Sequence, residues 1–204
     1  MTRIPGGPRI GAPLFVAGFI ASLVAGAALA RNTLFLPAAD AAQLRLYYST
    51  SGTAVWVSAL LQLAAATGLL MFADSADRRA RPAGRLAAAA FAGAAVLSVT
   101  LAAVASSAGD GTLLLLARLT LALGGPVHLA GLAGLLWFGS RAALADDRSP
   151  RWTARFGTVA APLLLVPLLS LAIPAVTRVE PLWRLLAAVR LLAAARRPTT
   201  AADR

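Results

Sequence analysis

The sequence predicts an all-α protein, a polytopic transmembrane helix bundle with five spans and a short C-terminal sixth helix. Three observations predict this class. Hydrophobic residues make up 59% of the 204 positions and charged residues 13%, a balance far from that of soluble domains. Five apolar runs are each long enough to cross a hydrocarbon core of about 30 Å. All 19 basic residues are arginine, and most of them fall between these runs, which is typical of topology signals and not of a nucleic-acid-binding face.

The first predicted span covers residues 13–30, "PLFVAGFIASLVAGAALA", and follows the basic segment "MTRIPGGPR". Its final Ala-Leu-Ala matches the small-x-small pattern of a signal-peptidase site. Gly18, Ser22, Gly26 and Ala30 are spaced four apart, however, and make one smooth stripe for close helix packing. Because the hydrophobic part of a signal peptide is usually shorter, we expect an uncleaved first span, with a removed signal peptide as the alternative.

The other predicted spans are residues 53–73, 86–107, 112–140 and 156–177. The run 112–140 is longer than a bilayer requires, so its beginning, "TLLLLAR", is expected at or beyond the outer interface. Arg118 would then snorkel to the headgroups, and the alternative is an Arg118 that faces a pocket. The fifth run contains Pro162, Pro167 and Pro174, which are candidate kinks. They mark either a hinge or kinks that neighbouring helices tolerate.

Arginine positions predict the orientation of the chain. Alternating spans place ten arginines on one side: Arg3, Arg9, Arg78, Arg79, Arg81, Arg85, Arg141, Arg148, Arg151 and Arg155. The opposite side receives Arg31 and Arg45 before the tail is counted. The positive-inside rule therefore predicts a multi-pass protein of the cell (cytoplasmic) membrane with a cytoplasmic N-terminus.

The tail from residue 181 contains a short apolar stretch with Arg190 near its middle. Pro181 suits a helix start, and Glu180 suits the positive end of that helix. A short sixth span over residues 181–197 would return the last arginines to the cytoplasm, whereas an interfacial amphipathic helix would leave them outside. Residues 198–204 are expected to be a disordered tail.

Residues 31–52 are the sizeable segment predicted outside the membrane, an extracytoplasmic connection between the first two spans. Asp40 suits the N-cap of a short helix through Tyr48. Leu44, Tyr47 and Tyr48 would face the membrane surface. The segment is then an interfacial helix that covers the bundle, or alternatively a lid over an outer vestibule.

Three segments carry a resemblance to known sequences. They are "LPAADAAQLRLYY", the following span "VWVSALLQLAAATGLLMFAD", and the arginine-rich turn "LWFGSRAALADDRSPRWTARFG" before a proline-containing span. Together they resemble a group of actinobacterial six-span integral membrane proteins of unknown function. The resemblance implies a six-span fold and implies no activity.

The chemistry of the chain is sparse. The sequence lacks cysteine, which excludes thiolate metal sites and cysteine nucleophiles. Its eight acidic residues fall in loops, at span ends or in the tail, so paired carboxylates for an intramembrane hydrolase are missing. A single histidine cannot make a His-x-x-x-His zinc site or a bis-histidine haem site within one chain. We expect no catalytic residues, no metal and no cofactor.

A small polar set remains inside the predicted spans. Counting from the span ends places Gln62, Ser98 and His128 near the midplane, as a candidate polar site. Polar groups in hydrocarbon are costly unless they are paired. Pro126, a further candidate kink beside Gly124 and Gly125, frees a backbone carbonyl that such a group could use. His128 is therefore expected to be neutral and hydrogen-bonded to Gln62 or to backbone, with a ligand-binding or proton-relay cavity at the Gly-Gly-Pro break as the alternative.

Three functions stay open on the sequence. The first is a non-catalytic accessory or interaction protein, because the tested catalytic constellations are absent from the sequence. The second is a facilitator or binder of a small apolar or lipid-like molecule. The third is a redox or enzyme subunit that depends on a partner chain for ligands. The expected partners are the lipid bilayer and other membrane proteins or a second copy of the chain, and not nucleic acid.

Overall fold

A computed structural model describes residues 7–34, 36–145, 151–165 and 192. Most of these residues are helical, and no β-strand occurs among them, which confirms the all-α prediction. Four helical stretches of this part are long and apolar enough to cross a membrane: Arg9–Leu29, Gly52–Ser75, Arg81–Val104 and Asp110–Ala145. Five or six crossings are not confirmed. The predicted fifth run is described only as far as residue 165, and the helix 181–197, apart from Leu192, and the tail 198–204 lie outside the described residues.

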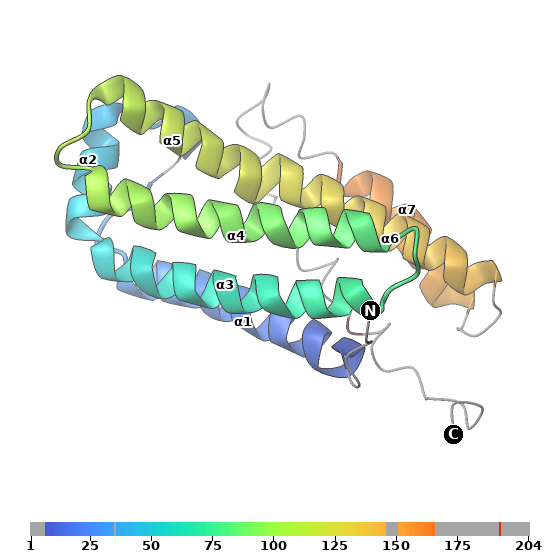
Figure 1. The fold of residues 1–204 in the computed structure, drawn as a ribbon. Coiled ribbons are helices and arrows are strands. Elements are labelled where there is room, and N and C mark those ends of the chain that lie inside the picture. Colours follow the sequence, from blue (N-terminus) through green and yellow to red (C-terminus); the bar gives the residue numbers. More distant parts are fainter. Residues whose placement is uncertain (1–6, 35, 146–150, 166–191, 193–204) are drawn as a thin grey trace.

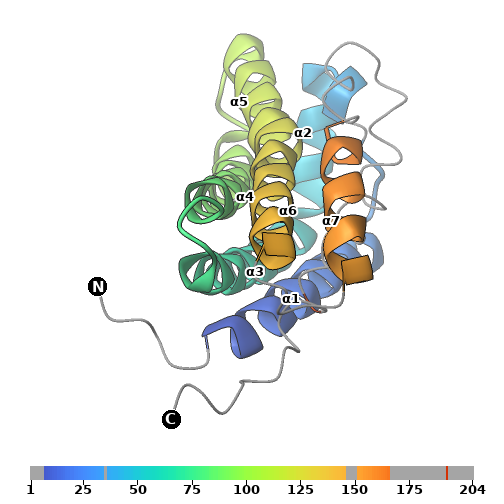
Figure 2. The ribbon, with the colours of Figure 1, turned by 90° about the vertical axis from the view of Figure 1, so that its right-hand side faces the viewer.

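The described elements follow one another in a simple order. They are α1 (Gly7–Leu29), the 3₁₀ turn η1 (Leu36–Ala38), α2 (Ala41–Thr50), α3 (Gly52–Ser75), α4 (Arg81–Val104), α5 (Asp110–Ala122), the π turn η2 (Leu123–Val127), α6 (His128–Ala145) and α7 (Arg151–Leu163). Helix α1 packs along α3, α3 along α4, α4 along α6 and α6 along α7. The short helix α2 lies across the end of the bundle where α4 ends and α5 begins, as Figures 1 and 2 show.

Helices α1, α4 and α7 begin five or six residues earlier than the apolar runs predict, and the structure gives a reason for α1 and α4. Helix α1 starts at Gly7 instead of residue 13 because its first turns pack on α3: a Cβ on Gly11 would lie 2.6 Å from the Gly68 carbonyl oxygen. Helix α4 covers Arg81–Val104 instead of 86–107, and Pro82 stands in its first turn. Proline is well placed there because the first turn leaves its backbone N–H groups without partners. Hydrophobicity alone does not mark either start.

The fourth predicted span, residues 112–140, is one continuous helical stretch of 36 residues, Asp110–Ala145. At about 1.5 Å per residue it is about 54 Å long, which exceeds a hydrocarbon core of about 30 Å. The Gly-Gly-Pro segment does not break it. Residues Leu123–Val127 form a π turn instead, and the wider turn accommodates Pro126, which has no N–H and would clash with the carbonyl four residues earlier in a regular helix.

Small residues set the distance between α1 and α3. A Cβ on Gly18 would lie 3.0 Å from the Leu61 carbonyl oxygen, and one on Gly26 would lie 3.3 Å from Ser58 Oγ. Ser58 Oγ also donates to the Ser22 carbonyl at 3.2 Å. The predicted stripe on the first span is therefore confirmed for these positions as a helix-packing face.

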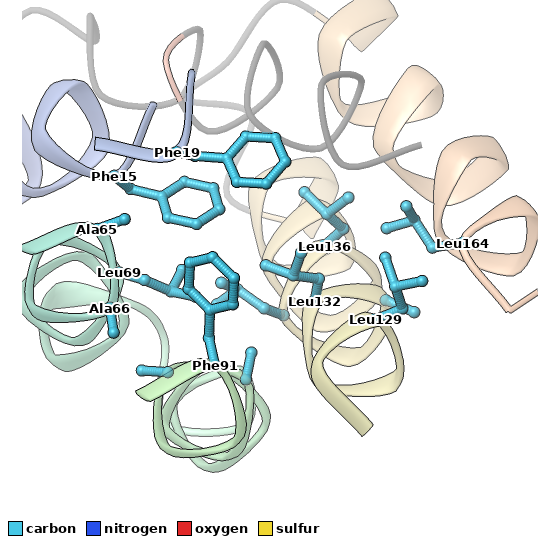
Figure 3. Close-up of a cluster of buried hydrophobic side chains, with 14 of the residues drawn as sticks. Phe15, Phe19, Ala65, Ala66, Leu69, Phe91, Leu129, Leu132, Leu136 and Leu164 are labelled. Atoms are coloured by element: carbon cyan, nitrogen blue, oxygen red, sulfur yellow. The ribbon is translucent and has the colours of Figure 1, made fainter. Parts of the chain in front are cut away.

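The buried side chains form two clusters. The larger one joins α1, α3, α4, α6 and the end of α7, with Phe15, Phe91, Leu69, Leu132 and Leu164 pointing into it (Figure 3). The second cluster lies at the end covered by α2 and consists of Leu44, Tyr48, Val55, Leu101, Ala105, Leu113 and Ala117. The first holds the membrane-length helices together, and the second fastens α2 to the bundle.

Candidate functional site around His128

His128 is the first residue of α6 after the π turn and is completely buried. Its Nδ1 lies 2.9 Å from the carbonyl oxygen of Ala87 on α4. Because a carbonyl oxygen only accepts hydrogen bonds, Nδ1 is the donor and carries the hydrogen. In the neutral ring Nε2 is then the acceptor. The bond joins α4 to α6 and matches the expected hydrogen bond to backbone.

Aromatic side chains from two other positions contact the imidazole. The Phe91 ring stacks on it with centroids 4.7 Å apart and an interplanar angle of 26°. The Phe15 ring from α1 lies 6.3 Å away at 48°. Residue 131, one turn further along α6, is a glycine whose Cβ would lie 2.6 Å from the Ala87 nitrogen. The imidazole is therefore held between three helices in a closely packed apolar setting.

The structure does not join the three predicted site residues. Gln62 is partly buried on α3, and within the described residues no hydrogen bond links it to His128. Ser98 Oγ donates to the Ala94 carbonyl of its own helix at 2.9 Å. Ser98 follows Phe91, which stacks on the imidazole, by seven residues on α4, or about 10 Å along the helix axis. The Ser98 hydroxyl therefore bonds to the backbone of its own helix, at a different level of the bundle from the imidazole.

The candidate kinks are only partly described. Pro126 is buried in the π turn, and Pro162 lies near the end of α7 with an exposed side chain. Pro167 and Pro174 lie outside the described residues. Because the π turn continues the helix, the predicted Gly-Gly-Pro break is replaced by a local widening beside His128.

The outer segment is fastened to the bundle. The Asp40 side chain accepts from the Gln43 backbone at 2.7 Å, and the Gln43 side chain accepts from the Asp40 backbone at 3.2 Å, a complete capping box. This confirms Asp40 as the N-cap of α2. Tyr48 is 5% exposed in the second cluster, and burial together with the charge of Tyr47 raises its pKa above the ordinary value. Tyr48 and Leu44 therefore face the bundle and not the membrane surface, which corrects the prediction for these two side chains.

Arg45 was not predicted as a structural contact, yet it closes this end. Its Nη1 donates to the Ala105 carbonyl at 2.7 Å and its Nη2 to the Ala108 carbonyl at 2.9 Å, and Nη2 also pairs with Asp110 at 2.6 Å. A cation at the C-cap carbonyl of α4, that of Ala105, is favourable for the helix dipole. The available signal was that Arg45 and Asp110 both fall in short polar stretches on the same predicted side of the membrane. Arg118, in contrast, is exposed on α5, as the snorkelling interpretation expects.

Metal-ligating side chains are few and scattered in the described part of the chain. Among the described residues there is no group of three or more histidine, cysteine, aspartate or glutamate side chains that could hold a metal. The described acidic residues are Asp40, Asp74, Asp77 and Asp110, and each lies in a loop or at a helix end. The fold thus defines an all-α protein with four helices suited to crossing a membrane, and its buried histidine sits in apolar packing. Comparisons with protein-family models, curated proteins and solved structures gave no match.

Proposed function

We propose that the chain is a multi-pass protein of the cell membrane that acts as a non-catalytic accessory or interaction subunit. The contacts of His128 carry this proposal. The side chain that could most readily serve chemistry donates to a backbone carbonyl and packs against two phenylalanine rings. An imidazole used in this way joins helices, as polar side chains in membrane bundles commonly do.

The proposal is tested on protein extracted gently from its own membrane. Native mass spectra and absorbance spectra would be compared for the wild type and for His128→Leu, which replaces the imidazole by an apolar side chain of similar size. We expect the same complexes in both, without a bound small molecule or an absorbance band. A small molecule that is lost in His128→Leu would establish the binder function instead. A cofactor band would establish the partner-dependent redox function.

The orientation is part of the proposal and rests on the arginine distribution. The chain has no cysteine, so a single engineered cysteine is the only residue that a thiol reagent can label. Ala42 and Arg79 are exposed at opposite ends of the bundle. A cysteine at Arg79 should be reached from the cytoplasm and one at Ala42 from outside; labelling of both from one side would overturn the topology.

Membership of the actinobacterial six-span group is proposed from the sequence segments quoted above. Six crossings return the C-terminus to the side of the N-terminus. A cysteine at Thr200 should then react from the same side as one at Arg79, whereas five crossings would place it on the side of Ala42.

A further inference from the structure

One end of the bundle is rich in arginine. It is the end where α1, α4 and α7 begin and where α3 and α6 end, opposite α2 in Figure 1. The described arginines there are Arg9, Arg78, Arg79, Arg81, Arg85, Arg141 and Arg155. The carboxylates described at this end are Asp74 and Asp77. The described surface of this end is therefore strongly cationic.

Both carboxylates already have partners. Asp74 accepts from Arg85 Nε at 2.7 Å. Asp77 accepts from the Arg79 backbone N–H at 2.9 Å, which closes the turn before α4. Within the described residues neither carboxylate forms a salt bridge with Arg81. Most of the positive charge at this end is thus not balanced by described acidic side chains.

Arg81 is the residue with the clearest need for an anion. Its side chain is partly buried, and its Nε is fully buried without an acceptor within the described residues. Its Nη2 reaches the Ala76 carbonyl at 3.4 Å, the long limit of a hydrogen bond. A buried donor on a charged group without an acceptor is costly. The planar guanidinium fork matches the oxygens of a phosphate, and a phosphate that the side chain turns to meet would supply the acceptor that Nε lacks.

The helix dipole gives a second argument for an external anion. Arg81 and Arg85 lie in the first turns of α4, and the first turn of that helix contains no acidic residue. A helix N-terminus favours negative charge, so arginines at this position do not stabilise the helix by themselves. An anion bound outside the protein would interact favourably with the arginines and with the helix end at once.

Aromatic side chains at the same end indicate which kind of anion would suit this surface. Trp152 is 71% exposed and Phe156 is 42% exposed on the first turns of α7. Arg141 lies over the exposed Trp137 ring, with the guanidinium carbon 5.7 Å from the ring centroid. Exposed tryptophan beside arginine is typical of the boundary between headgroups and acyl chains. A soluble phosphate would not require an apolar surface next to the cations, whereas a phospholipid provides both parts.

We propose that the arginine end of the bundle binds the headgroups of anionic phospholipids, with Arg81 as a phosphate ligand at the start of α4 and the aromatic residues of α6 and α7 against the acyl chains. This assignment goes beyond the proposed accessory function because it gives one surface a defined chemical partner. It does not depend on that function or on which side of the membrane the end faces.

The test uses the full-length protein in detergent micelles doped with either phosphatidylglycerol or phosphatidylcholine, and follows thermal unfolding. Phosphatidylglycerol should raise the wild-type midpoint more than phosphatidylcholine does. Arg81→Gln should lose at least half of this difference, and Arg81→Lys should fall between the two because it keeps the charge and loses the fork. Arg31→Gln, at the opposite end of the bundle, removes the same charge and should keep the full difference.

Several results would overturn the proposal. Equal stabilisation by the two lipids would show that the surface does not select anionic headgroups. Equal losses in Arg81→Gln and Arg31→Gln would show a general effect of net charge. Inorganic phosphate at matched ionic strength that reproduces the shift would replace the lipid by a free anion. If Arg81→Gln does not fold, Arg79→Glu at an exposed position should lower the phosphatidylglycerol difference, and an unchanged difference there would also refute the proposal.

Discussion

Replacement of Gly131 by alanine should force α6 away from α4. The new Cβ would lie 2.6 Å from the Ala87 nitrogen, 2.8 Å from the Ala87 Cα and 2.8 Å from the Ala83 carbonyl oxygen. Ordinary contact begins at 3.4 Å, so the two helices must separate locally by about 0.8 Å to accept one methyl group. The atoms that would be hit belong to the backbone of α4, which cannot rotate out of the way as a side chain can.

The size of the effect follows from three contributions, one of which is stabilising. Overpacking of this kind costs about 1–3 kcal/mol of unfolding free energy. Alanine gains at most about 1 kcal/mol over glycine from helix propensity. Separation of the helices would also lengthen the 2.9 Å bond between His128 and the Ala87 carbonyl, and bonds of this kind contribute about 0.6 kcal/mol. Together these contributions predict that Gly131→Ala is less stable than the wild type by about 0.5–2.5 kcal/mol.

Gly139 on the same helix is the matched control, because a Cβ there would meet nothing within 4 Å. Reversible unfolding in mixed micelles with increasing dodecyl sulfate, followed by tryptophan fluorescence, measures both variants. Gly139→Ala should equal or slightly exceed the wild type in stability. If Gly131→Ala behaves like Gly139→Ala, the close approach of α4 and α6 is not a feature of the folded protein.

Three further predictions concern single side chains. Arg45→Ala should speed amide hydrogen exchange across α2, while exchange in α6 stays unchanged. Asp110→Asn should have a smaller effect because the two hydrogen bonds from Arg45 to backbone carbonyls remain. Equal effects of the two variants would show that the ion pair alone holds α2. His128→Leu should fold, with an unfolding free energy lower by about 0.6 kcal/mol. His128→Ala should lose at least about 2 kcal/mol of unfolding free energy because it opens a cavity beside Phe91. Failure of His128→Leu to express would show that the hydrogen bond contributes more than this. Burial raises the pKa of Tyr48 above 10.0, so the folded state keeps the phenol proton to higher pH than the unfolded state does. The free energy of unfolding should therefore fall as the pH rises above about 10. Tyr48→Phe should make this fall less steep, and an unchanged pH profile in Tyr48→Phe would contradict the prediction.

The sequence was sufficient for features that depend on composition or on local pairs. The all-α class follows from long apolar runs, because only helices satisfy the backbone within each such run. The start of α2 was predicted from Asp40, and Gln43, three residues later, completes a reciprocal cap that the prediction did not use. Both results depend on residues that are near one another in the chain, so no knowledge of packing was required.

The candidate site was harder to predict because its contacts are made by groups without a sequence signature. The hydrogen-bond partner of His128 is the backbone carbonyl of Ala87, and every residue has such a carbonyl. The positions of Ser98 and His128 were both counted from the ends of their runs, but α4 begins at Arg81 and not at residue 86, and the residue of α4 that meets the imidazole is Ala87. Equal counting therefore did not place Ser98 beside the imidazole. Phe15 and Phe91 were likewise indistinguishable from other apolar residues of their spans.

The π turn at Leu123–Val127 changes how the long helix presents its two halves. Each residue of a regular helix advances the side chains by about 100° around the axis, and a π turn amounts to one extra residue. The side chains of α6 are therefore rotated by about 100° from where an uninterrupted continuation of α5 would point them. The two halves of one long helix can thereby pack into two clusters that lie in different directions. Leu113 and Ala117 face the cluster under α2, while Leu129 and Leu132 face the cluster shared with α1 and α7. The π turn at Gly124, Gly125 and Pro126 thus rotates the side chains of α6 relative to those of α5, so the apolar face of each half can be directed at its own cluster.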